Sequence, residues 1–328
     1  FTQPSVVRSP VSLTFGVVSL PPLHGRDQPQ LTRGYNGGVP GPTIRVWPGE
    51  TLHINLRNEL GGGRLPPSLR MPFNDFHSLN TTSLHTHGLH VSPRKPADDV
   101  FGKVAPGEMT KYVYDVPDSH MGGTHWYHPH VHGASTVQVG GGAIGLIIVE
   151  DPPGVLPAQL EGMEERHLVV MDLRPESLAR VTSRFESACR KGGGSAEECH
   201  EPLWSADKPS NMGRRQLGMG MPKASTKPGD EVDLRMLVNG HLEPMRTRID
   251  AEQWYRFRIL FGSSGGRAAR QGTGGMMMGR RELGMMDHDE WDGSDLRPAL
   301  RGCETQLLAK DGVYLPQAPR PIEFGFMS

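Results

Sequence analysis

Glycine and proline interrupt this sequence so often that long helices have little room to form. The 328 residues include 42 glycines and 29 prolines, about twice the usual share of these two residues. Because both are poor helix formers, the composition excludes a helical bundle and favours short strands joined by tight turns. Residues 51–57, after a Pro48-Gly49 turn, alternate apolar and polar side chains, which is the period of a strand with one buried face.

Strand-like stretches divide the chain into two expected domains. The first domain covers residues 1–152, with strands predicted at 43–47, 51–57, 111–116 and 143–150. Residues 153–162 are a linker, and the second domain covers residues 163–328, with strands predicted at 166–171, 231–239 and 254–261. Two low-complexity insertions, at about 187–230 and 262–300, are expected to be irregular because they lack periodicity. The pattern predicts an all-β fold of the sandwich or Greek-key type.

The charges nearly cancel, which limits the classes of partner. A net charge of −1 gives no overall field toward nucleic acid or an anionic membrane. The most apolar run, residues 143–149, is far short of the roughly 20 residues that cross a bilayer, so no membrane span is expected. No signal peptide is visible, although a chain that opens on Phe1 can have lost a leader. Cys189 and Cys199 can pair, which leaves Cys303 over.

Histidines are concentrated between positions 85 and 132. The eight are His85, His87, His90, His120, His125, His128, His130 and His132. In the pairs His85-Thr86-His87 and His128-Pro129-His130, both imidazoles point to the same face of a strand, about 6.5 Å apart. If the two strands are neighbours, four neutral nitrogens converge on a metal site, and an all-imidazole set suits copper well, with zinc and iron as alternatives. Gly88 and Gly133 follow the pairs and allow close approach of the backbone.

The residues around the two pairs resemble the first two copper motifs of the multicopper oxidases, the laccase-like blue copper oxidases. The motifs are LHTHGLH at 84–90 and GGTHWYHPHVHG at 122–133. The segments YNGGVPGPTI at 35–44, LVNG at 237–240 and CETQLLAKDGVYL at 303–315 are similar to other markers of the family. The resemblance implies two cupredoxin-like Greek-key β-sandwich domains, the second one interrupted by the insertions and incomplete.

The resemblance also implies a copper ligand role for each paired histidine. His85 matches a ligand of the type 2 copper in a trinuclear copper cluster. His87 and His128 match ligands of one type 3 copper, and His130 matches a ligand of the other. These four histidines are a partial ligand set, because the family uses eight.

Four further residues near the motifs have weaker expected roles. His125 and His132 fall outside the ligand pattern and are expected to orient their neighbours through hydrogen bonds. Asp98 is the nearest match to an acidic residue that assists proton delivery in the family, with Asp99 as its rival. A solvated pair of loop carboxylates is the other interpretation of these two aspartates.

A complete oxidase of this family takes single electrons at a type 1 copper and passes four of them to the cluster, which reduces O2 to water. The remaining ligands belong to a third domain, and this chain stops before one begins. The one Cys-His dipeptide, Cys199-His200, lacks the flanking histidines of a type 1 site. We therefore expect part of a secreted, periplasmic or cell-surface oxidase that acts on phenols, aromatic amines or metal ions. Alone, it is expected to be inactive without the missing domain, supplied in cis or by another chain.

Other functions stay open on the sequence alone. A non-enzymatic copper-binding or copper-tolerance protein would use the histidine pairs together with the methionines of the two insertions, because thioethers select Cu(I). Methionine-bearing low-complexity sequence without function explains the same stretches. A zinc hydrolase is disfavoured because no carboxylate base is obviously placed beside the histidines, and a copper nitrite reductase is disfavoured because residues 80–140 contain no cysteine. The electron donor is not predicted.

Overall fold

The structure is a computed structural model that describes most of the first 200 residues and shorter parts of the rest. The described residues are 2–22, 29–61, 76–201, 203, 235–242, 250, 253–263, 304, 306–310, 312–316 and 320–321. The larger part of both predicted insertions, with all of their methionines, lies outside these residues. The prediction for 187–230 is wrong at its start, because residues 187–191 end a helix.

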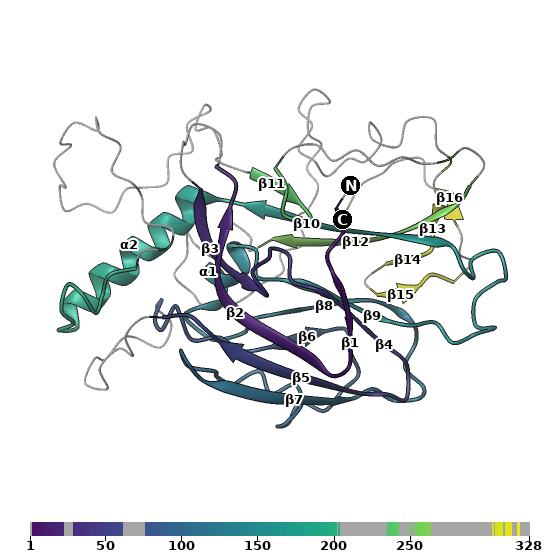
Figure 1. Cartoon of the computed structure of the whole chain (residues 1–328), viewed down its shortest axis with the longest axis horizontal. Coiled ribbons are helices and arrows are strands. Elements are labelled where there is room, and N and C mark those ends of the chain that lie inside the picture. Colours follow the sequence, from purple (N-terminus) through teal and green to yellow (C-terminus); the bar gives the residue numbers. More distant parts are fainter. Residues whose placement is uncertain are drawn as a thin grey trace.

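Two β-sheets pack face to face in the first part of the chain (Figure 1). One sheet has the order β1-β4-β9-β8-β6 and the other has the order β3-β2-β5-β7. The strands are β1 Val6–Arg8, β2 Val11–Leu20, β3 Gln30–Tyr35, β4 Thr43–Val46, β5 Thr51–Asn58, β6 His85–His87, β7 Met109–Asp115, β8 Gly123–His128 and β9 Gly145–Val149. Parallel pairing joins β1 with β4, β4 with β9 and β2 with β5, and the other pairs are antiparallel.

The core of this sandwich follows from the alternation seen in the sequence. Leu52, Ile54 and Leu56 on β5 are buried, while the residues between them face outward. Every residue of β9 is buried, as expected for a continuous apolar run in the middle of a sheet. The predicted strands at 43–47, 51–57, 111–116 and 143–150 are therefore confirmed to within a few residues, and with them the all-β class.

A three-stranded sheet and two helices complete the larger elements. In this sheet β10 (Glu164–Leu173) pairs antiparallel with β11 (Arg235–Val238) and parallel with β12 (Tyr255–Ser263). The remaining elements are α1 Ser135–Gly140, α2 Pro175–Lys191, β13 Gln306–Leu307, β14 Ala309–Lys310, β15 Val313–Tyr314 and β16 Arg320–Pro321. Neither helix of the described part has the length and apolarity of a bilayer crossing. The domain boundary at 153–162 stays a prediction.

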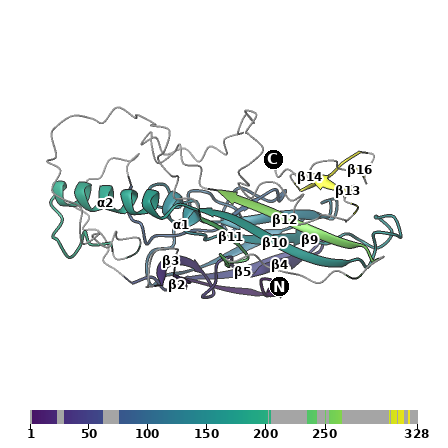
Figure 2. The ribbon, with the colours of Figure 1, turned by 90° about the horizontal axis from the view of Figure 1, so that it is seen from above.

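Helix α2 is the main element that was not predicted from the sequence. It lies at one end of the molecule, beyond the strands (Figures 1 and 2). Its buried residues Leu178, Val181 and Phe185 recur every three or four positions, which is the spacing of one helix face. Pro175 stands at its first turn, where the missing N–H of proline is tolerated.

Buried charges join the three-stranded sheet to the sandwich. The Glu165 carboxylate on β10 accepts from Arg258 Nε on β12 at 2.8 Å and from Arg45 Nη1 on β4 at 2.9 Å. Arg258 Nη1 also donates to the Thr124 hydroxyl on β8 at 2.9 Å. Burial acts to raise the pKa of Glu165, but hydrogen bonds from His167 and Arg258 and the charges of both arginines lower it. A single carboxylate therefore pairs with three guanidinium groups, since Arg256 Nη1 on β12 also lies 3.6 Å from Glu165 Oε1.

Replacing Glu165 by Gln is expected to destabilise the protein. Arg258, whose side chain is 3% exposed, would lose its nearer anionic partner and keep Asp151 at 3.8 Å. We expect a loss of about 2–3 kcal/mol in the free energy of unfolding, measured with urea. The control is Glu164→Gln, at a neighbouring carboxylate that is 46% exposed and bonds Arg166; it should change stability by less than about 0.5 kcal/mol. Equal effects of the two variants would contradict this role.

Candidate metal centre

The two His-x-His segments meet because β6 and β8 are antiparallel neighbours. Their register sets His85 opposite His128 and His87 opposite Trp126. Since alternate residues of a strand share a face, the imidazoles of both segments lie on the same side of the sheet. The neighbouring strands that a four-histidine site requires are thus present.

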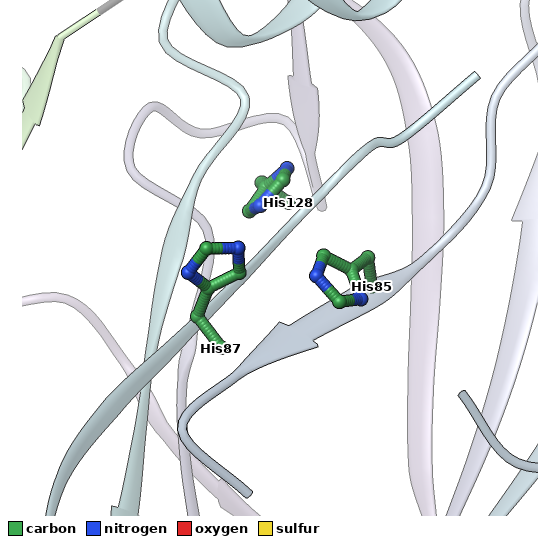
Figure 3. Close-up of side chains that lie close together, drawn as sticks. All are labelled: His85, His87 and His128. Carbon is green, nitrogen blue, oxygen red and sulfur yellow. The ribbon is translucent and has the colours of Figure 1, made fainter. Parts of the chain in front are cut away.

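Three of the four paired histidines form one compact group. Each of His85, His87 and His128 has a ring nitrogen within 4.8 Å of a ring nitrogen of the other two, and Figure 3 shows their rings around a common space. His130 lies beside this group, with its ring centroid 4.9 Å from that of His85 and 6.1 Å from that of His128. The structure therefore brings all four predicted residues together, three of them closely.

Asp98 orients His85. Its Oδ2 lies 2.9 Å from His85 Nδ1, and its Oδ1 accepts the backbone N–H of Thr86 at 3.0 Å. A carboxylate in this position accepts a hydrogen bond from the Nδ1–H and so keeps the proton on Nδ1, which leaves His85 Nε2 with a free lone pair. Asp99 points elsewhere, because it accepts the Phe101 N–H and lies 3.9 Å from Lys95 Nζ. Asp98, the first of the two sequence candidates, is therefore the one in contact with the histidines.

His128 and His130 each hold a buried ring nitrogen without a hydrogen-bond partner. His128 is fully buried; its Nδ1 donates to the Pro129 carbonyl at 2.8 Å, and its Nε2 has no partner. His130 Nδ1 is also unpartnered, while the His130 backbone N–H donates to Ser83 Oγ at 2.9 Å. Buried polar atoms left unpaired cost free energy. A metal ion that accepts these lone pairs would remove that cost, so the donor set fits one.

Burial keeps these imidazoles neutral. It lowers the pKa of His128 to about 3 and that of His87 to about 4, with positive charge on neighbouring histidines acting in the same direction. The pKa of His130 is lowered for the same reasons. The Trp126 ring stacks on the His128 ring with centroids 4.4 Å apart and lies 4.7 Å, centroid to centroid, from the His87 ring. These contacts limit the rotation of both imidazoles. Neutral, fixed imidazoles are the form in which histidine binds copper, zinc or iron.

The expected orienting role of His125 is wrong. Because β8 alternates, His125 faces the side of the sheet opposite to His128, where its ring lies 5.4 Å from that of His120. Gly88, at φ +93°, leaves room for it, since a Cβ there would lie 2.3 Å from His125 Nδ1. His132 does lie near the group, with its ring 6.0 Å from that of His130.

A second histidine cluster, around His125, was not predicted from the sequence. His120 Nε2 accepts the His90 backbone N–H at 3.1 Å, and its Nδ1 donates to the Met121 carbonyl at 2.8 Å. Both ring nitrogens of His120 are therefore occupied, which leaves it no lone pair for a metal ion. Closely spaced histidines are the sequence signal for both clusters. The alternation of side chains along β8 places the two clusters on opposite faces of the sheet.

Cys199 carries no free thiol for a type 1 copper site. It forms a disulfide with Cys189, which is the pairing that the sequence left open. The expectation that Cys199-His200 is not a type 1 motif is confirmed by this bond, because a thiolate sulfur is required there.

Comparisons with known proteins agree with the motifs. The multicopper oxidase family profile matches residues 73–154. The chain is 27% identical over 150 residues to a laccase of Bacillus subtilis (strain 168), covering 40% of this chain and 27% of that protein. It is 34% identical over 127 residues to an iron transport multicopper oxidase of Candida albicans, covering 38% of this chain and 17% of that protein. It is 24% identical over 239 residues to the multicopper oxidase MmcO of Mycobacterium tuberculosis, covering 70% and 38%.

A solved structure of a laccase from Pediococcus acidilactici aligns with 52% of this chain and 34% of its own, at 25% identity and a TM-score of 0.39. The chain spans less than two fifths of the length of each of these relatives. The profile match includes both histidine motifs. The resemblance read from these motifs is therefore confirmed: residues 73–154 match the multicopper oxidase profile, and the proteins to which the chain is similar include a laccase.

Proposed function

We propose that this chain supplies His85, His87, His128 and His130 as ligands of a trinuclear copper site in a multicopper oxidase. The observation that carries the proposal is the convergence of three imidazoles whose nitrogens lie within 4.8 Å, together with the unpartnered His128 Nε2. In the assignment implied by the resemblance, His85 serves the type 2 copper, His87 and His128 serve one type 3 copper, and His130 serves the other.

Copper, when bound, supplies the one-electron redox chemistry by which O2 is reduced to water. The protein contributes fixed imidazole donors, through the pairing of β6 with β8 and the stacking of Trp126. Asp98 holds the proton of His85 at Nδ1 and so keeps Nε2 as the donor atom. Because Asp98 is 9% exposed, its carboxylate is also placed to pass a proton from solvent toward the site.

The whole oxidase requires partners that the described residues do not contain. The reducing substrate is proposed to be a phenol, an aromatic amine or a metal ion, and the further copper ligands come from another cupredoxin domain in cis or from another chain. The Cys189–Cys199 disulfide supports an exported location, secreted, periplasmic or at the cell surface, because disulfides persist in oxidising compartments.

Replacing His128 by Ala is expected to remove most of the copper bound by this chain. His128 is fully buried between His85 and His87, so its loss removes one of the three converging imidazole donors. We expect at least tenfold weaker Cu(II) binding by calorimetry, with circular dichroism as a check on the fold. His53→Ala is the control, because His53 is exposed on β5. Copper binding by His128→Ala at the level of the unaltered chain would rule out the assignment.

Copper binding, measured together with O2 consumption, distinguishes the oxidase function from the copper-tolerance function. Stoichiometric copper binding combined with O2 consumption, once the remaining ligands are supplied, supports the oxidase. A stable Cu(I) complex that never consumes O2 under these conditions would favour the copper-tolerance alternative.

Asp98→Asn should weaken copper binding about 10- to 100-fold, the usual cost of losing a carboxylate that orients a ligating histidine. The amide retains the shape of the side chain but can present its NH2 to His85, which removes control of the tautomer. Asp99→Asn is the matched control, since Asp99 contacts Phe101 and Lys95 and no histidine. If the two variants bind copper equally well, Asp98 has no orienting role.

The lowered pKa values predict how the metal-free protein responds to acid. His128 and His87 have folded pKa values of about 3 and 4, against about 6.5 in the unfolded chain. The unfolded state therefore binds more protons between pH 6.5 and about 4, and stability falls as the pH falls through this window. Each such histidine contributes about 1.4 kcal/mol per pH unit.

His128→Ala should therefore make the pH dependence of stability shallower. Urea unfolding of the metal-free protein at pH 4.5, 5.5 and 6.5 measures the slope. Parallel stability curves for the variant and the unaltered chain would show that His128 is not held neutral in the folded state.

A further inference from the structure

A buried ion pair connects the sandwich to the loop after helix α2. Arg33 on β3 has no exposed surface, and its Nη2 donates to Glu201 Oε2 at 2.8 Å. Glu201 is 3% exposed and is separated from Arg33 by 168 residues. Its other oxygen accepts the Leu203 N–H at 3.0 Å. Glu201 is therefore the anionic partner that allows a guanidinium group to stay inside the protein.

The Cys189–Cys199 disulfide closes the loop that ends two residues before Glu201. Cys189 lies in the last turn of α2 and Cys199 lies ten residues later, two residues before Glu201. Both sulfurs are buried in the cluster that contains Leu79 and Val137. Gly194 packs against them, because a Cβ there would lie 2.5 Å from Cys199 Sγ. The bond thus sets where the chain re-enters the protein and where Glu201 stands.

The other end of Arg33 holds the segment that leads into the histidine strand. Arg33 Nε donates to Asn80 Oδ1 at 3.0 Å. Gln138 Nε2, on α1, donates to the carbonyls of Leu79 and Thr81, both at 2.8 Å. Three residues after Asn80, Ser83 Oγ accepts the backbone N–H of His130. Residues 79–83, called here the ligand-support segment, therefore connect Arg33 with His130 and with His85, the first residue of β6.

We propose that the Cys189–Cys199 disulfide is a structural latch for the proposed copper site. Closed, it holds Glu201 on Arg33, and Arg33 in turn fixes the ligand-support segment. Without the bond, the residues that follow Cys199 are no longer tied to the last turn of α2. The loop then no longer fixes Glu201, and Arg33 is left as a buried charge without its partner.

The latch acts on the site through position and not through contact with a metal. Arg33 Nη1 already lacks a hydrogen-bond partner, so the guanidinium has no spare interaction to replace Glu201. Because an uncompensated buried charge is costly, the structure is expected to relax by letting Arg33 and Asn80 move toward water. Glu201 and Arg33 are thus positioning residues for His85 and His130. The copper part of this inference rests on the proposed function.

The test uses the full chain with two variants that open the latch in different ways. Cys189→Ser with Cys199→Ser removes the bond, and Glu201→Gln removes the charge but keeps the loop closed. Glu198→Gln is the matched control: it makes the same change in the same loop at an exposed residue that contacts Ser195 and not Arg33. Amide hydrogen exchange reports on residues 79–84, and calorimetry reports on Cu(II) binding.

We expect both latch variants to exchange the amides of residues 79–84 at least tenfold faster, while the exchange of the β5 and β7 amides is unchanged. We also expect both variants to bind Cu(II) about tenfold more weakly. The combined variant should be no worse than either one alone, because both act through Arg33. Glu198→Gln should match the unaltered chain. If the cysteine variant does not fold, Glu201→Gln decides the question.

Two outcomes separate this inference from the proposed function. Unchanged exchange and unchanged copper binding in Glu201→Gln, in a chain that binds copper, would overturn the latch and leave the copper site standing. An unaltered chain that binds no copper would refute the proposed function, while faster exchange in the variants would still establish the latch.

Discussion

The pairing of β6 with β8 is the constraint on which the histidine site depends. β6 brings His85 and His87, β8 ends at His128, and the register that sets His85 opposite His128 places these three imidazoles on one face. A slip by one residue would turn one set of imidazoles to the opposite face of the sheet. That register is held by β9 on the far side of β8, a strand whose every residue is buried. A continuous apolar strand at the centre of the sheet therefore determines the geometry of a polar site at its edge.

Burial of the imidazoles has two opposed effects. It keeps His87 and His128 neutral, with pKa values of about 4 and about 3, and so ready to act as ligands. It also leaves His128 Nε2 without a hydrogen-bond partner, which costs stability in the metal-free protein. Trp126 and Asp98 do not remove this cost. They restrict the rings to an orientation in which a bound metal ion would remove it. The metal-free fold is therefore less stable than it would be with paired nitrogens, but its imidazoles need no rearrangement to act as donors.

Local patterns were sufficient to predict the parts of the fold that repeat with a short period. The alternation at Leu52, Ile54 and Leu56 predicted β5, and the spacing of the histidine pairs predicted their common face. Helix α2 was missed because its apolar positions are few and lie next to a glycine-rich stretch that suggests irregular structure. His125 was misassigned because neighbouring positions in sequence point to opposite faces. The Arg33–Glu201 pair joins residues 168 positions apart, a relation that no local pattern contains.

The second part of the chain also supports the domain that carries the histidine site. Thr124, Trp126 and His128 share one face of β8, and the Thr124 hydroxyl accepts a hydrogen bond from Arg258 on β12. Arg258 is held in turn by Glu165 on β10. The strand that carries His128 is therefore supported by elements beyond residue 154, where the family match ends. The unit that stabilises the histidine site must include the three-stranded sheet, because residues 73–154 alone would retain the ligands but lose their support.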